Sequence, residues 1–182
     1  MIELIQDGGV TSAKGFEAGA TYAGLKTSTD EVLDLAILLS HTPASVAGTF
    51  SKNRVLSPSV VLTKERVTRG QTRGVVVNSG CANCCVGSQG LKDAEEMTSL
   101  AARHVDTKAQ EMLVASTGII GVELPMALIR QNIANINVTK DGGKSFALAI
   151  MTTDTHPKEV AVSVDISGKR IIVGGAAKGA GM

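Results

Sequence analysis

The sequence has 182 residues, of which 43% are hydrophobic, so the chain is long enough and apolar enough to bury a sizeable core. Eighteen basic residues balance seventeen acidic ones to give a formal net charge of +1, and the aromatic residues are three phenylalanines and one tyrosine. This balance offers neither a basic surface for phosphate backbones nor aromatic platforms for bases, which argues against nucleic acid as a partner.

Membrane and secretory segments are not predicted. The longest uncharged apolar stretch near the front, Leu35 to Leu39, is far shorter than the roughly 20 residues that a membrane span requires. Residues 1–16 lack a basic region followed by an apolar run, as a secretory signal would have. We therefore expect a cytoplasmic protein.

The first half of the chain contains short β-rich runs separated by turn-forming residues. Thr-Pro, Ser-Lys-Asn and Arg-Gly sequences interrupt them. Runs of this length and composition predict strands. The expected strands lie at residues 33–40, 44–50, 58–65 and 73–80.

Residues 90–105 carry the clearest helical pattern. Apolar residues from Leu91 through Met97 to Val105 share one stripe at helical spacing, with acidic residues early and a basic one late. The elements expected after this helix are a strand from Glu111, a helix from Pro125 to about Ile133, a helix at about 143–151, and strands at 159–166 and 169–175.

This order of elements predicts an α/β fold with mixed β-sheets and helices packed on their faces. We find no internal repeat or long linker, so we expect residues 1–182 to form a single domain. The last strand runs directly into a glycine tract, and its edge is open unless another chain covers it. A partner chain is therefore expected.

The three cysteines, Cys81, Cys84 and Cys85, all lie in one short segment, GCANCC. Cys81 and Cys84 have the C-x-x-C spacing of a redox pair or half a zinc site. A structural zinc site needs about four ligands, and the three histidines lie far away in sequence. We expect no metal, and interpret the cysteines as small buried residues in a turn after a strand.

Two strand ends carry hydroxyl groups, amides and glycines of the kind found at active-site rims. In VASTGIIG, Thr117 and Gly118 could aim a hydroxyl and a backbone N–H at one point, as stabilisation of an oxyanion requires. The alternative is a helix-capping threonine followed by a turn glycine. In VVNSGCAN, Asn78 and Ser79 could orient a substrate at the rim, or could be ordinary turn residues.

The segment MTTDTHPK offers Thr152, Asp154 and His156. Asp154 and His156 suggest a catalytic triad, but they lie two residues apart in a turn and the chain has no G-x-S-x-G motif. Asp154 could equally bond its own backbone. We therefore do not assign a triad here, and we expect His41 and His104 to be surface residues.

The chain finishes on IIVGGAAKGAGM, which is unusually small and flexible for a terminus. A phosphate loop would need a hydroxyl residue directly after the lysine, and Lys178 is followed by Gly179. A lysine among glycines suits a small carboxylate, because the backbone can approach closely. We interpret the tract as an interior loop that has been cut.

These segments together resemble the ornithine acetyltransferase family, also called the glutamate N-acetyltransferase family, of arginine biosynthesis. The resemblance extends over nearly the whole chain in the family's order. The residues that carry it are KGF (14–16), VAGTFSKN (46–53), VVVNSGCAN (75–83), MLVASTGIIG (112–121), AIMTTDT (149–155) and GGAAKGAGM (174–182). The resemblance implies the self-processing, DmpA/ornithine acetyltransferase-like fold.

In this family a precursor cuts its own backbone just beyond a stretch like GAKGAGM, and the freed threonine begins a second chain. The resemblance therefore implies that residues 1–182 are the N-terminal (alpha) chain and that the beta chain of the same precursor is its partner, in a dimer of alpha–beta pairs. That threonine would attack N-acetylornithine and pass the acetyl group to glutamate, with its own α-amino group as base.

The resemblance also implies roles for residues of this chain. Thr117 and Gly118 match the family's oxyanion hole, and Thr152 and Lys178 match its substrate contacts, with Lys178 pairing with the α-carboxylate. No cofactor is implied, and the use of acetyl-CoA as a donor stays open. The CANCC segment departs from the small non-thiol residues expected in relatives. The alternatives are a self-processed aminopeptidase of related fold and a non-catalytic ligand-binding module.

Overall fold

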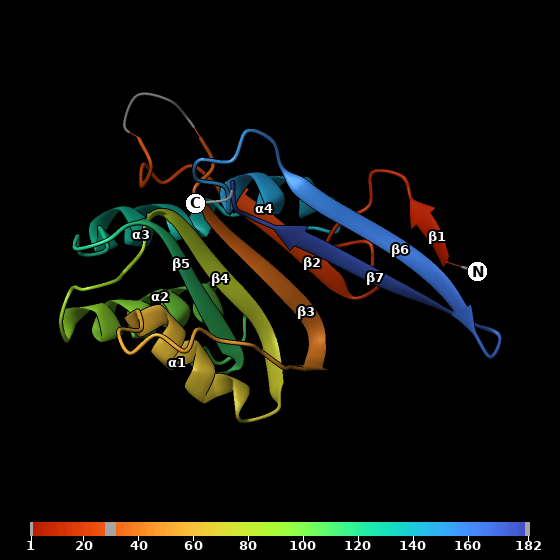
Figure 1. The fold of residues 1–182 in the computed structure, drawn as a ribbon, viewed down its shortest axis with the longest axis horizontal. Helices are drawn as coiled ribbons and strands as arrows, with labels where there is room; N and C mark the ends of the chain where they lie inside the picture. Colours follow the sequence, from red (N-terminus) through yellow and green to blue (C-terminus); the bar gives the residue numbers. More distant parts are fainter. Residues whose placement is uncertain (1, 28–31, 181–182) are drawn as a thin grey trace.

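The structure, a computed structural model, describes residues 2–27 and 32–180. Its strands form two sheets (Figure 1). The larger sheet has the order β2-β3-β4-β5, with strands Phe16–Thr21, Leu35–Ser45, Gln71–Cys81 and Met112–Ile119. The smaller sheet has the order β1-β6-β7, with strands Ile2–Ile5, Lys158–Ile166 and Lys169–Ala177. Neighbouring strands are antiparallel except β4 and β5, which are parallel, so the larger sheet is mixed as predicted.

Helices cover both faces of the larger sheet, which confirms the predicted α/β class. Helices α1, α2 and α3 pack on one face, and α4 lies on the other (Figure 1). None of the helices in the described part of the chain is long and apolar enough to cross a bilayer. The helices span Pro58–Val67 (α1), Gln89–His104 (α2), Met126–Asn132 (α3) and Gly143–Ala149 (α4), with short 3-10 turns at Ala109–Glu111 and Ile133–Asn135.

Strand β3 separates the two cores because successive side chains of a strand point to opposite faces. Leu35 and Ile37 are fully buried on the face of α2 and α3, where they join Met97. Ala36, between them, packs on the other face with Phe146 of α4. Full burial of a leucine or isoleucine contributes about 1.5–3 kcal/mol, so this two-sided strand is a main support of the fold.

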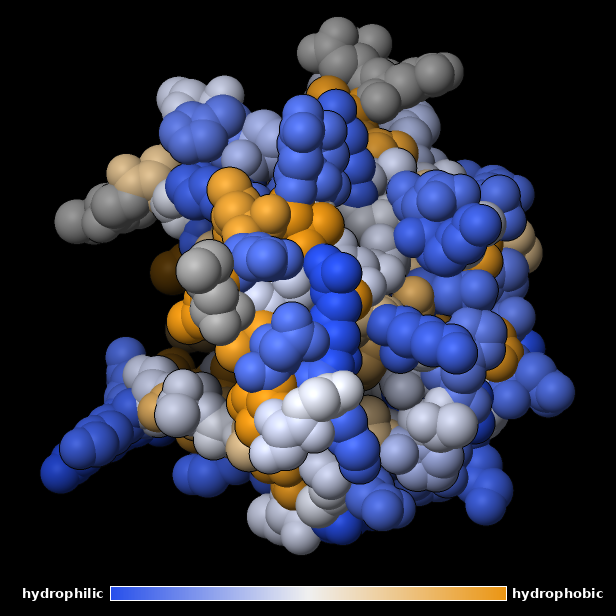
Figure 2. Space-filling view, turned by 90° about the vertical axis from the view of Figure 1, so that its right-hand side faces the viewer, coloured by the Kyte–Doolittle hydropathy of each residue, from blue (hydrophilic) through white to orange (hydrophobic). Residues whose placement is uncertain are grey.

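The three-stranded sheet presents an apolar face to the outside. Leu4 and Val162 lie directly opposite each other across β1 and β6, and Val162 lies opposite Val173 of β7. Figure 2 shows hydrophobic residues among hydrophilic ones on this side of the molecule. The exposed large apolar residues on these three strands are Ile2, Leu4, Val160, Ile166, Ile171 and Val173. As predicted, the last strand is an edge strand, and the final residues of its glycine tract, 181 and 182, lie outside the described residues.

The prediction of a strand at residues 58–65 is wrong, because this segment forms helix α1. The Ser57 hydroxyl accepts a hydrogen bond from the Val60 backbone N–H, and Pro58 occupies the first turn. Both features favour a helix start, and they prevail over the β-branched valines that suggested a strand. Leu62 and Arg66, four residues apart, are both buried against the sheet.

Other boundaries differ in the first half of the chain. The two strands expected at 33–40 and 44–50 are one strand, β3, whose pairing with β4 is irregular between Leu39 and Ala44. Residues 46–50 are not part of it. Strands β1 and β2 were not predicted, because each is short, with glycines soon after β1 and directly before β2. The later elements are confirmed, although α4 ends at Ala149 rather than at Met151.

Candidate active site at the ends of strands β4 and β5

The parallel pairing of β4 and β5 brings two predicted site segments together at the ends of these strands. Ser79 lies opposite Thr117, and Gly80 opposite Gly118, with a register shift directly after Gly80. Residues at this edge line a cleft of about 850 Å³. Its lining residues are Lys26, Gly80, Thr117, Gly118, Ile119, Thr152, Thr153, Lys178, Gly179 and Ala180.

Position 118 requires glycine. Its φ of 133° lies in a region that side chains strongly disfavour, and a Cβ there would come within 2.2 Å of the Gly80 carbonyl carbon. Thr117 and Gly118 both belong to β5, and the next helix begins only at Met126. The helix-capping interpretation of Thr117 is therefore wrong.

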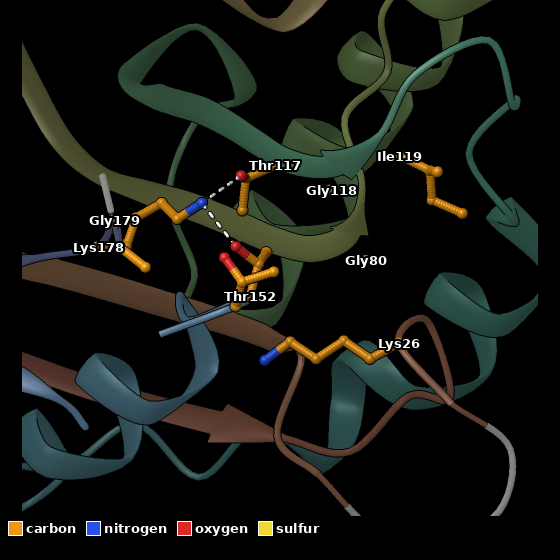
Figure 3. Close-up of a pocket in the computed structure, with 10 residues that line it drawn as sticks. Lys26, Gly80, Thr117, Gly118, Ile119, Thr152, Lys178 and Gly179 are labelled. Carbon is orange, nitrogen blue, oxygen red and sulfur yellow. Dashed lines mark hydrogen bonds between the residues drawn. The ribbon is translucent and has the colours of Figure 1, made fainter. Parts of the chain in front are cut away.

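Lys178 connects the two predicted threonines. Its ammonium group donates to Thr117 Oγ1 at 2.9 Å and to Thr152 Oγ1 at 2.8 Å (Figure 3). An ammonium has three N–H donors, so one remains available for a ligand in the cleft. Because Thr117 accepts from Lys178, its own hydroxyl hydrogen is free to donate elsewhere. Four predicted site residues, Thr117, Gly118, Thr152 and Lys178, thus line one cleft.

Asp154 holds the two loops that carry Thr152 and Lys178. Its carboxylate accepts the backbone N–H of Gly179 at 2.6 Å and that of Thr152 at 3.1 Å, and it pairs with Lys158. Its side chain has no exposed surface. His156 Nδ1 lies 3.1 Å from the hydroxyl of the neighbouring Thr155. The segment therefore contains no Asp–His catalytic pair, and Asp154 positions the backbone of the site.

The pKa of Asp154 lies well below its ordinary value of 3.8, because Lys158 first, and then the Gly179 and Thr152 N–H groups, stabilise its charged form. A carboxyl group with a lowered pKa stabilises the fold fully above its unfolded pKa, and this contribution is lost only as the pH falls through the lower folded pKa. We therefore expect the Gly179 amide chemical shift, followed by NMR, to titrate with a midpoint below pH 3.8. Asp154→Asn should abolish this titration, and a wild-type midpoint at or above 3.8 would contradict the assignment.

The predicted rim residues Asn78 and Ser79 do not line the cleft. Both are fully buried. The Ser79 hydroxyl donates to the Ala149 carbonyl at the end of α4, and the Asn78 amide donates to the Cys81 carbonyl at 2.9 Å. Their contacts support the strand end from behind, so the prediction that they form a rim is wrong.

Lys26 lines the cleft and was missed by the sequence analysis. Its ammonium donates to the carbonyls of Leu33 at 2.8 Å and Ala149 at 3.3 Å, and Figure 3 shows it directed towards Thr152. Burial lowers its pKa, and the carboxylates of Asp34 and Asp154 oppose this effect. Lys26 lies in no motif, so only the fold reveals its place.

The cysteines differ from the prediction that all three are buried. Cys81 is buried in β4, Cys84 is partly buried, and Cys85 is exposed. Within the described ranges, no three His, Cys, Asp or Glu side chains are grouped as metal ligands. His41 is exposed as expected, whereas His104 is partly buried and bonds the Ile136 carbonyl.

Two solved structures with this fold are similar to this chain along its whole length. A crystal structure of arginine biosynthesis bifunctional protein argJ from Bacillus halodurans matches with a TM-score of 0.94 and 36% identity, covering 100% of this chain and 95% of that one. Ornithine acetyltransferase from Mycobacterium tuberculosis, solved in complex with ornithine, matches with a TM-score of 0.93 and 38% identity, covering 100% and 97% of the two chains.

Curated relatives give the same result at the level of sequence. The arginine biosynthesis bifunctional protein ArgJ of Dehalococcoides mccartyi is 45% identical over 181 residues, and that of Symbiobacterium thermophilum is 44% identical over 177. These matches cover 100% and 96% of this chain but only 45% and 44% of the relatives, so the chain spans less than half of their length. The ArgJ family model matches residues 17–182. The chain belongs to the ArgJ family.

Proposed function

We propose that this chain forms part of the active site of an acetyltransferase that moves the acetyl group of N-acetylornithine to glutamate. The observation that carries the proposal is the Lys178 ammonium, which bonds both Thr117 and Thr152 in a cleft that Gly118 also lines. The ornithine in the related Mycobacterium tuberculosis structure supports an amino acid as the ligand of this fold.

The nucleophile of this reaction belongs to a second chain. The curated relatives are more than twice as long as the matched region, whereas the solved chains are nearly the same length as this one. That difference supports a precursor that is divided into two chains. Its second chain begins with a threonine, whose α-amino group serves as the base because it titrates near neutral pH.

Acetyl transfer then proceeds in two steps. The threonine hydroxyl attacks the acetyl carbonyl of N-acetylornithine, and the amine base takes its proton. The resulting oxyanion accepts the Gly118 N–H and the Thr117 hydroxyl hydrogen. When the C–N bond breaks, the proton passes to the leaving ornithine amine and an acetyl-threonine remains. The glutamate amine attacks this ester, releases the threonine and becomes N-acetylglutamate.

Lys178 binds the α-carboxylate that both amino-acid substrates share, through its remaining N–H, and Thr152 keeps the ammonium in position. This mechanism requires only protein groups and the two substrates, so no cofactor is involved. Acetyl-CoA can enter the same cycle as an alternative donor if the second chain leaves room for it. We further propose a cytoplasmic enzyme built as a dimer of two-chain units.

Steady-state transfer of labelled acetyl from N-acetylornithine to glutamate, measured on the complete two-chain protein, tests this function. Lys178→Met should raise the KM for both substrates, by about tenfold or more, because an ion pair made in the ground state and the transition state alike is uniform binding. Lys144→Met, at an exposed lysine outside this cleft, is the matched control. An unchanged KM for both substrates in Lys178→Met would exclude the proposed role.

A further inference from the structure

Two adjacent thiols lie in the loop that follows β4. The Cys84 and Cys85 sulfur atoms are 3.9 Å apart, and Cys85 is exposed. The third thiol, Cys81, is buried and separate, with its sulfur 3.0 Å from the Val122 carbonyl oxygen. The proposed acetyl transfer uses none of these groups.

The fold holds the loop in an uncommon backbone conformation. Asn83 and Cys85 both have positive φ, 49° and 60°, in the left-handed region that few residues adopt. The buried Asn83 amide donates to the Gly90 carbonyl at 2.8 Å and to the Ser59 hydroxyl at 3.1 Å. The loop is thus anchored to both α1 and α2, and the two thiols are held together on a fixed support.

We propose that Cys84 and Cys85 form a reversible oxidation site that reacts with hydrogen peroxide or an organic peroxide. The exposed Cys85 thiolate attacks the peroxide and becomes a sulfenic acid, as one water or alcohol leaves. The Cys84 sulfur then displaces the sulfenic hydroxyl as water and forms the disulfide. In total, two S–H groups are oxidised, one peroxide bond is reduced and two hydrogens leave the protein.

The different surroundings of the two thiols determine which of them is oxidised first. Burial and the contact with Cys85 raise the pKa of Cys84, which keeps it protonated, while Cys85 faces the solvent. Exposed cysteines with a neighbouring thiol are those that react and are then resolved as disulfides. Cys85 is therefore oxidised first and Cys84 resolves it.

The disulfide is strained and hence easily reduced. Adjacent Cα atoms lie about 3.8 Å apart across a trans peptide, less than the usual separation of about 4.4–6.8 Å in disulfides. A disulfide between adjacent cysteines closes a small ring that includes the peptide bond between them. Forming this ring must twist the Cys84–Cys85 peptide. Strained, exposed disulfides have more oxidising potentials than structural ones, so dithiols should reverse this modification.

The twisted peptide connects the oxidation site to the candidate active site. The carbonyl of this peptide, that of Cys84, accepts the Gly121 N–H at 2.8 Å, and the neighbouring Ala82 N–H donates to the Ile119 carbonyl at 2.8 Å. Gly118, which lines the cleft, directly precedes Ile119 in the chain. Oxidation should therefore loosen the segment 118–121. Only the expected effect of oxidation on the rate of acetyl transfer rests on the proposed function.

Intact mass and peptide mapping of the complete protein after treatment with hydrogen peroxide test the site itself. We expect the loss of two hydrogens per chain, mapped to a Cys84–Cys85 link and reversed by dithiothreitol. Cys81→Ser, the matched control, should still form the link, whereas Cys84→Ser and Cys85→Ser should not. Direct oxidation of Cys85 to sulfinic acid in the wild type, without the link, would overturn the proposal.

Hydrogen exchange of residues 118–121 and the transferase rate test the connection. Exchange at Gly121 should become faster in the oxidised wild type and not in peroxide-treated Cys84→Ser. The kcat should fall about tenfold, the scale of one lost hydrogen bond, and recover with dithiothreitol. A disulfide that changes neither exchange nor rate would refute the connection. A protein without transferase activity before oxidation would instead refute the proposed function, and the mass and exchange results would still decide this inference.

Discussion

Replacing Thr117 by alanine is expected to lower the kcat for acetyl transfer by about two orders of magnitude, the scale of losing one oxyanion donor. The reason is geometric. Thr117 Oγ1 accepts the Lys178 ammonium at 2.9 Å, so its hydroxyl hydrogen is available to the oxyanion. Lys178 keeps its bond to Thr152 in this variant, so the KM should change much less than the kcat.

Thr117→Ser is the matched control, because it retains the hydroxyl and should keep most of the activity. Thermal unfolding of both variants separates a loss of catalysis from a loss of folding. If the folded alanine variant keeps a kcat near that of the wild type, Thr117 is not an oxyanion donor. Equal losses in the serine and alanine variants would also contradict the role of the hydroxyl.

Gly118→Ala should have a still larger effect on activity and should also destabilise the protein. The added Cβ would lie 2.2 Å from the Gly80 carbonyl carbon and 2.6 Å from the Cys81 nitrogen, so the end of β5 must move away from β4. Backbone strain alone at such a φ costs about 1–3 kcal/mol. In the proposed mechanism the displaced Gly118 N–H then no longer reaches the oxyanion, and we expect a kcat at least about two orders of magnitude lower.

Gly121→Ala separates the clash from the general cost of a side chain at positive φ. Gly121 has a φ of 77°, and a Cβ there would have no heavy atom within 4 Å. This variant should lose some stability but keep most of the kcat. Chemical denaturation and the transfer assay on both variants give the comparison. Equal effects at the two positions would show that contact with Gly80 does not matter.

The sequence predicted the strands and helices best where one pattern dominated. The stripe of α2 was unambiguous, and Ala94, Met97 and Ala101 on it are fully buried. Residues 58–65 were misassigned, because local β-propensity outweighed the capping signal of Ser57 and Pro58. Propensity is a weak determinant when tertiary packing decides, and here the helix buries Leu62 against the sheet.

The site residues were predictable only through the combination of motifs. Thr117, Thr152 and Lys178 lie far apart in the chain, and no local pattern shows that one ammonium bonds both threonines. The burial of Asn78 could not be predicted either, since asparagine, serine and glycine are also common in exposed turns. Lys26 lines the cleft and is held there by hydrogen bonds to the Leu33 and Ala149 carbonyls. Every residue has a backbone carbonyl, so no sequence pattern indicates such bonds.

In the proposed reaction this chain supplies the oxyanion and substrate-binding side of a site whose nucleophile begins a second chain. Intact mass spectrometry of the protein expressed from its full-length gene, before and after N-acetylornithine, tests this claim most directly. We expect two chains without added protease, the second starting with threonine and gaining one acetyl group, which glutamate then removes. A protein that stays one chain, or a second chain that never gains the acetyl group, would contradict the claim.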